Sequence, residues 1–203
     1  MANQPKILGE CYTKFGLQHT SKSQNTMPDD IRFRNYIVLT PKEKANLPAN
    51  CSFTGGTIAH EIIQKMLCEN ITYEQALKAV EKRITNYVSI DEKDDLKFGH
   101  IIDNMEDLVN NHLANINEVG KQKWQSELEY THWADGIKTY FLAYVDLVGQ
   151  VDFGDIKNVF GTLTKTKKGF SYSKKKCPKV PYHSDCLQIA LYSKLLPTLK
   201  PFL

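Results

Sequence analysis

The feature that most constrains the fold is a ten-residue stretch from Asp146 to Asp155, in which two short apolar runs flank a Gly-Gln pair. Such a pair between β-prone runs is typical of a tight hairpin turn, so the stretch predicts two antiparallel strands. Alternate side chains of a strand share a face. Asp155 and Lys157 are therefore expected on one face, while Ile156 between them points into the core.

These residues also form the layout expected of metal-dependent phosphodiester chemistry. Asp155 can hold a divalent cation, and Asp146 on the neighbouring strand can supply a second carboxylate. Lys157 can orient or deprotonate a water. Asp146 stands among apolar residues, where a buried carboxylate is costly without a cation or another partner. The Asp-x-Lys pattern alone is usually an exposed ion pair on a strand, so the assignment depends on the residues around it.

Helical periodicity precedes these strands. Two glycines are followed by Thr57, a candidate N-cap for a helix with an apolar stripe. Thr72 predicts the start of a second helix, and residues 95–117 predict a third.

The pattern then changes to β-branched and aromatic residues. These predict strands over 124–130, 138–148 and 151–159. Residues 161–183 are rich in Lys, Gly, Ser and Pro and predict an extended loop. Ser184-Asp185 is expected to cap a last helix, which a proline ends.

Residues 1–50 read as an irregular N-terminal segment. Residues 51–203 are expected to form one α/β domain, with a helical part at 54–118 and a sheet with the final helix at 119–203. The length of 203 residues suffices for one domain with a real core.

Composition excludes several classes of protein. A net charge of +3 permits a nucleic-acid partner without implying one. No apolar run is long enough to cross a membrane and the start lacks a secretory or transit signal, so an intracellular protein without a membrane partner is expected. The five cysteines are scattered without a C-x-x-C pair, which argues against a disulfide framework, a zinc ribbon and an iron–sulfur cluster.

Further polar residues fall in an order that, together with the acids and the lysine, resembles a RecB-type exonuclease of the PD-(D/E)XK nuclease superfamily. The similarity covers roughly residues 53–196 and is greatest to the mitochondrial genome maintenance exonuclease and its phage-encoded relatives. The matching pieces are Gly-Gly-Thr-Ile-Ala-His60, Ser-Glu127, Val-Asp146-Leu-Val, Gly-Asp155-Ile-Lys157 and Gln188-Ile-Ala-Leu-Tyr192.

The resemblance implies a mixed sheet flanked by helices, with an N-terminal helical elaboration and one or two Mg²⁺ or Mn²⁺ ions. It implies that Gln188 and Tyr192 hold the DNA backbone and brace the site. Two departures are Asn158, where the family often has Thr, and a strand after the last helix that must be very short or missing. The catalytic set would be Glu127, Asp146, Asp155 and Lys157, and the metal would be bound by His60, Glu127, Asp146, Asp155 and the carbonyl of Ile156.

Glu129 competes with Glu127, because residues two apart in a strand share a face. Either carboxylate could reach the metal, and the family pattern favours Glu127.

The last quarter of the chain is strongly basic. From residue 151 onward it holds ten lysines and three aspartates, a net charge of +7 against +3 for the whole chain. A charge run is usually a solvated face, but here Phe170 and Tyr172 interrupt it. Lysines that neutralise phosphates and aromatic rings that stack on bases are how proteins grip single strands without reading sequence. The predicted grip comprises Phe170, Tyr172, Lys174, Lys175 and Lys176.

Together these features predict a metal-dependent DNA exonuclease that acts on single-stranded or frayed ends in DNA replication, recombination, repair or phage DNA metabolism. A phage-encoded protein would work in the host cytoplasm. Two alternatives stay open: a nuclease-like DNA-binding module that has lost its chemistry, and a structure-selective endonuclease of the same superfamily.

Overall fold

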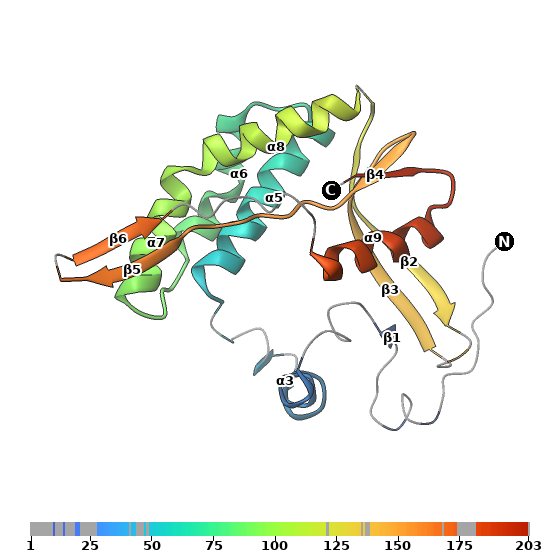
Figure 1. Cartoon of the computed structure of the whole chain (residues 1–203), viewed down its shortest axis with the longest axis horizontal. Helices are drawn as coiled ribbons and strands as arrows, with labels where there is room; N and C mark the ends of the chain where they lie inside the picture. The colour runs from blue at the N-terminus through green and yellow to red at the C-terminus, as the bar shows by residue number, and fades with distance from the viewer. Residues whose placement is uncertain are drawn as a thin grey trace.

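The computed structural model describes residues 10, 14, 19–20, 28–40, 42–43, 47, 49–120, 122–134, 136, 139–167, 169–173 and 182–202. The chain is a mixed α/β structure, in which the helices of residues 51–119 gather at one side and a mixed sheet lies at the other (Figure 1). The described N-terminal elements are β1 (His19–Thr20), α3 (Asp29–Phe33) and the π-helix η1 (Arg34–Val38).

The first long helix starts earlier than predicted. Helix α5 (Cys51–Glu69) is capped by Asn50, whose side chain accepts a hydrogen bond from Phe53 N at 2.9 Å, so the prediction of Thr57 as the cap is wrong. The glycine pair lies inside the helix because the packing there is close. A Cβ at Gly55 would lie 2.6 Å from Ile101 Cγ2.

The second helix starts where the sequence predicts. Helix α6 (Tyr73–Thr85) begins with a capping box between Thr72 and Gln75. The third predicted helix is two helices, α7 (Glu92–Asp103) and α8 (Met105–Val119). They meet at Asn104, whose side-chain amide donates to His100 O at 2.8 Å.

Strand β3 organises the sheet. Its predicted partner β2 (Gln125–Ala134) pairs antiparallel along nearly all of β3 (Thr139–Val148). The other edge of β3 is shared, because β1 pairs parallel near its start and β4 (Asp152–Gly154) pairs antiparallel at its end. Gly149 N donates to Asp152 O at 2.8 Å, which closes the predicted turn.

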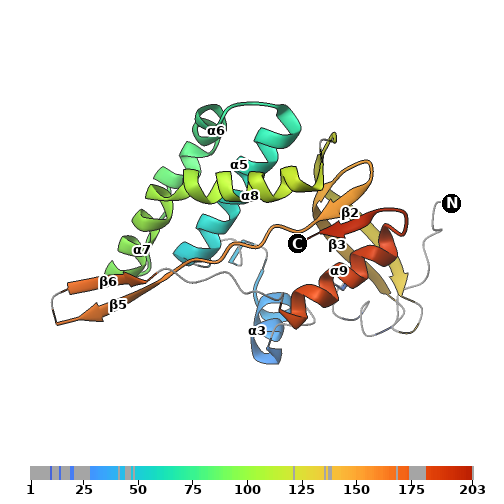
Figure 2. The same ribbon diagram turned by 45° about the horizontal axis from the view of Figure 1, so that its top comes forward.

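The prediction of a strand over 151–159 is wrong, because β4 has only three residues. Its far edge is taken by β7 (Lys200–Phe202), which runs parallel to it, so the strand expected to be very short or missing after the last helix is present and very short. The Phe202 ring leaves no room for a Cβ at Gly154. After Gly154 the chain leaves the sheet and passes beside the helices (Figures 1 and 2).

The basic stretch is not the extended loop that its composition predicts. It contains a hairpin of β5 (Thr162–Thr166) and β6 (Gly169–Ser173), which lies beside α7 (Figure 1). Helix α9 (His183–Leu195) follows and packs along the sheet (Figure 2). Its N-cap is Tyr182, which gives no side-chain cap bond, so the predicted Ser184-Asp185 cap is wrong.

Two apolar clusters fix these layers. The larger joins helices α5 to α8 to the sheet and includes Ile58, Ile62, Met105 and Leu147. The smaller lies where α9 packs on β3 and β4, and includes Val145 and Phe153. Burial of such side chains is the main force that holds helices onto a sheet. The end of β4 is therefore held between two packed layers.

Candidate functional site

The predicted acids come together where the chain separates from β3 at the end of β4. We call this place, formed by Asp146 and residues 154–157, the fork. The chain turns away from β3 after Gly154, and the Asp146 carboxylate bridges the gap by accepting a hydrogen bond from Ile156 N at 2.7 Å. The buried side chain of Ile156 joins the larger apolar cluster, as predicted for this position. Asp155 and Lys157 thus lie directly after β4 and not on a strand face.

Asp155 and Lys157 form an ion pair between Lys157 Nζ and Asp155 Oδ2. It is not the exposed pair that the bare sequence pattern suggests, because the Asp155 side chain is 4% exposed and that of Lys157 is 37% exposed. Within the described residues, the Lys157 ammonium is the ion-pair partner of Asp155 Oδ2, and no other donor reaches this oxygen. A carboxylate this deeply buried requires a cation beside it.

Gln188 connects both members of that pair. Its Nε2 donates to Asp155 Oδ1 at 2.8 Å, and its Oε1 accepts from Lys157 Nζ at 3.2 Å. The second amide hydrogen goes to the Tyr192 hydroxyl at 2.6 Å. The opposite orientation of the amide would turn its oxygen toward the Asp155 carboxylate, so the network itself determines which way Gln188 points.

Tyr192 lies beneath this network, buried in the smaller apolar cluster. Its hydroxyl donates to the backbone carbonyl of Tyr144 at 2.7 Å, at the part of β3 between the pairings with β1 and β4. Burial raises the pKa of the Tyr192 phenol, so the group stays protonated and remains a donor. This geometry favours the bracing role expected for Tyr192 over direct contact with DNA.

His60 on α5 lies against the fork. Its Nδ1 is 3.7 Å from Asp146 Oδ2. Burial lowers the pKa of His60, and the negative charge of Asp155 and a hydrogen bond to the Ile156 backbone act in the opposite direction. A neutral imidazole has a free lone pair, which is the form that binds metals.

Two more polar residues at the site were not singled out from the sequence. Gln64, one helical turn beyond His60, donates to Asp146 O at 3.2 Å. His112 of α8 is within 3.0 Å of Asn158 Oδ1, and Asn158 Nδ2 donates to Gly56 O at 3.4 Å. The spacing of four from His60 could have revealed Gln64, whereas His112 looks like one polar residue in an amphipathic helix.

The two candidate glutamates differ in placement. Ser126 and Leu128 pair with Leu147 and Val145, so Glu127 between them lies opposite Asp146 in the register; the placement of its side chain lies outside the described part of the chain. The exposed Glu129 accepts a hydrogen bond from the Tyr144 hydroxyl at 2.8 Å.

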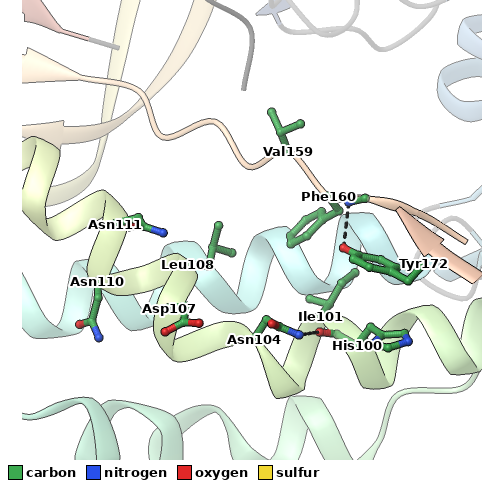
Figure 3. A pocket seen from close by; sticks show the side chains of 11 residues that line it. His100, Ile101, Asn104, Asp107, Leu108, Asn110, Asn111, Val159, Phe160 and Tyr172 are labelled. Atoms are coloured by element: carbon green, nitrogen blue, oxygen red, sulfur yellow. Dashed lines mark hydrogen bonds between the residues drawn. The ribbon is translucent and has the colours of Figure 1, made fainter. Parts of the chain in front are cut away.

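The hairpin residues predicted to grip DNA lie at the far end of the segment that leaves the fork (Figures 1 and 2). The Tyr172 ring stacks on His100 at 4.8 Å between centroids, and its hydroxyl accepts from Gly161 N at 3.0 Å. Tyr172 and Phe160 border a cavity (Figure 3), whose volume is about 490 Å³. The Tyr172 ring is thus already packed, while Phe170 is half-buried and Lys174, Lys175 and Lys176 lie outside the described residues.

The fork offers mainly oxygen donors for a metal. Within the described part of the chain, no three His, Cys, Asp or Glu side chains are already arranged as a metal centre. The carboxylates of Asp146 and Asp155 nevertheless meet at one fork, and the buried Asp155 Oδ2 lacks a hydrogen-bond donor. Hard oxygen ligands of this kind suit Mg²⁺ or Mn²⁺.

Comparisons with protein-family models, with curated proteins and with solved structures found no match. Among the described helices, none has the length and apolar character needed to cross a bilayer.

Proposed function

We propose that this protein is a Mg²⁺- or Mn²⁺-dependent DNA exonuclease with a RecB-type PD-(D/E)XK core, which hydrolyses phosphodiester bonds from single-stranded or frayed ends. One observation carries the proposal: two carboxylates and a lysine meet at the fork after β4, and one buried carboxylate oxygen has the Lys157 ammonium as its only partner among the described residues. The ordered set of residues that resembles the RecB-type exonucleases adds support.

The residues at the fork divide the work by chemistry. Asp146, Asp155 and the Ile156 carbonyl would hold the cation, with His60 and Glu127 as further donors. The bound ion would act as a Lewis acid on the phosphate and lower the pKa of a water. Lys157 would place its ammonium beside the attacking water or a phosphate oxygen, since more than a third of its side chain reaches solvent.

Gln188 and Tyr192 are positioning residues, which hold the reacting side chains in place. Gln188 holds the Asp155 carboxylate and the Lys157 ammonium at once, so it sets the separation of the two groups. Tyr192 orients Gln188 and is itself anchored on the backbone of β3. A shift of about 1 Å at such a support can reduce a rate about a hundredfold.

A second function has one observation in its favour. The Lys157 ammonium already neutralises Asp155, which is the arrangement expected of a DNA-binding module that no longer holds a metal. The two functions differ in what a divalent cation does. In the exonuclease it switches on hydrolysis, whereas in the module it changes neither the DNA nor the protein.

The deciding experiment is digestion of linear single-stranded oligonucleotides labelled at either end, with Mg²⁺, Mn²⁺, Ca²⁺ or EDTA. We expect stepwise shortening with Mg²⁺ or Mn²⁺ and intact DNA with Ca²⁺ or EDTA. Asp155→Asn is the matched control, because it keeps the shape of the side chain and removes its charge. Cleavage of covalently closed circular single strands would identify an endonuclease instead, and intact linear DNA in every metal would exclude hydrolysis.

A further inference from the structure

Two exposed aromatic side chains border a cavity next to the fork. Phe53, in the first turn of α5, is 68% exposed, and Tyr182, at the N-cap of α9, is 52% exposed. Both line a cavity of about 400 Å³, together with Asn50, Ser52 and residues 158–160. Large aromatic rings left in water beside a cavity mark a surface that another molecule covers.

Helix α5 connects this cavity to the fork. Phe53 and His60 are seven residues apart, which is nearly two helical turns, so they lie on the same side of α5 about 10.5 Å apart along its axis. Gly56 lies between them, and its carbonyl accepts the hydrogen bond from Asn158. The segment after Lys157 therefore runs along α5 from the fork toward Phe53.

The lining of the cavity selects the kind of ligand. Its polar residues are two asparagines and one serine, and it contains no Lys, Arg, Asp or Glu among the described residues. An uncharged lining does not attract phosphate, whereas aromatic rings and amide groups suit a flat heterocycle with polar edges. The Lys97 ammonium donates to Ser52 Oγ at 2.7 Å. This contact places one positive charge beside the cavity, where it could attract a phosphate of the DNA backbone.

We propose that Phe53 and Tyr182 form a clamp that holds one unpaired base of the substrate strand. The clamp rests on the proposed exonuclease function, because it assigns the ligand as part of the strand being cut. Stacked duplex DNA rises about 3.4 Å per nucleotide and an unstacked strand is more extended, so a span of about 10.5 Å holds at most about three nucleotides. The clamped base therefore lies within about three nucleotides of the phosphate at the fork. This selects single strands, since both faces of a base are free only when it is unstacked.

The test is binding of a fluorescent single-stranded oligonucleotide, followed by anisotropy in the Asp155→Asn background so that the DNA stays intact. Stacking of one base contributes about 1–3 kcal/mol, so Phe53→Ala with Tyr182→Ala should weaken binding about 5- to 150-fold. Phe53→Tyr with Tyr182→Phe keeps both rings and should retain the affinity. Val88→Ala removes an exposed apolar side chain after α6, outside the cavity lining, and serves as the matched control.

A single abasic site moved along the oligonucleotide then identifies the clamped base. We expect a loss of affinity at one or two adjacent positions, and this loss should disappear in the Phe53→Ala, Tyr182→Ala protein because the base has no partner there. Two results overturn the clamp. One is an abasic site that lowers the affinity of that variant as much as it lowers the affinity of the unsubstituted clamp. The other is strong binding that an abasic site does not weaken at any position.

The clamp and the exonuclease can fail separately. Cleavage by the wild-type protein without a clamp-dependent abasic penalty removes the clamp and leaves the nuclease. An abasic penalty that depends on the two rings in a protein that never cleaves removes the nuclease and supports the clamp as a base-binding site. Absence of both binding and cleavage overturns both, and would leave the rings as a surface for a protein partner.

Discussion

Replacement of Lys157 by methionine should destabilise the protein in the absence of divalent metal. The change removes the ammonium that contacts Asp155 Oδ2 and leaves a carboxylate that is 4% exposed without a cation. Removal of one partner of a fully buried ion pair costs about 3–5 kcal/mol. The Lys157 side chain is partly exposed and solvent screens it, so we expect about 2–3 kcal/mol. For a chain of this length that is a fall in Tm of roughly 4–12 °C.

Magnesium should reverse this loss if the fork holds the ion. A ligand at one hundred times its Kd stabilises the folded state by about 2.7 kcal/mol, which matches the expected cost. Thermal melts of Lys157→Met in EDTA and in saturating Mg²⁺ should therefore differ by several degrees. The wild-type protein should gain less, because its ammonium already neutralises Asp155.

The double variant Asp155→Asn, Lys157→Met is the control that isolates the buried charge. It carries no unpaired carboxylate at this position, so it should melt near the wild type in EDTA and lose most of its response to Mg²⁺. A Lys157→Met protein that melts within about 1 °C of the wild type in EDTA would refute the dependence of Asp155 on a cation. An undiminished Mg²⁺ response in the double variant would place the metal elsewhere.

Three further outcomes are expected from other parts of the site and the basic region. Tyr192→Phe removes the hydroxyl that donates to the Tyr144 carbonyl and accepts from the Gln188 amide, so urea unfolding should show a loss of about 1–3 kcal/mol, and the rate of the proposed nuclease should fall. Burial lowers the pKa of His112, so the folded state disfavours its protonated form. The contribution of the neutral side chain to stability is therefore present above about pH 6.5 and is lost as the pH falls through the lowered pKa of the folded state. Urea midpoints should therefore fall more steeply between pH 7 and 5 in the wild type than in His112→Asn. Neutralisation of Lys174, Lys175 and Lys176 should make the plot of log binding constant against log salt concentration less steep for single-stranded DNA. The slope should fall by about 0.7 for each phosphate that a lysine no longer neutralises, and an unchanged slope would mean that these lysines form a solvated surface.

Local sequence was sufficient where a structural feature depends on neighbours in the chain. The capping box at Thr72 needs only the residue three positions later, and it forms as predicted. Strands β2 and β3 carry β-branched and aromatic residues and are joined by a short connection, so they pair as expected. The meeting of Asp146 with Asp155 was also predictable, because a tight turn lies between them.

Distant contacts decided the rest. Asn50 caps α5 and not Thr57, and the glycines between them lie within the helix because α7 packs closely at Gly55. The break at Asn104 divides a continuous apolar pattern into two helices. The basic stretch forms a hairpin because Tyr172 packs on α7 and bonds to Gly161. The contacts of Gly55 with Ile101 and of Tyr172 with His100 join residues far apart in the chain, beyond the window that a periodicity argument uses.

The short strand β4 explains why the site needs α9. A strand continuing past Gly154 would cover the edge of β3 and include Asp155 in its ladder. Because β4 pairs only with the end of β3, it does not reach Tyr144, whose carbonyl accepts a hydrogen bond from the Tyr192 hydroxyl of α9. The same helical turn carries Gln188, which then reaches Asp155 and Lys157. The end of β4 thus creates the fork, and α9 contacts both β3 and the acids there, so the packing of α9 and the geometry of the acids should change together in any variant that alters either.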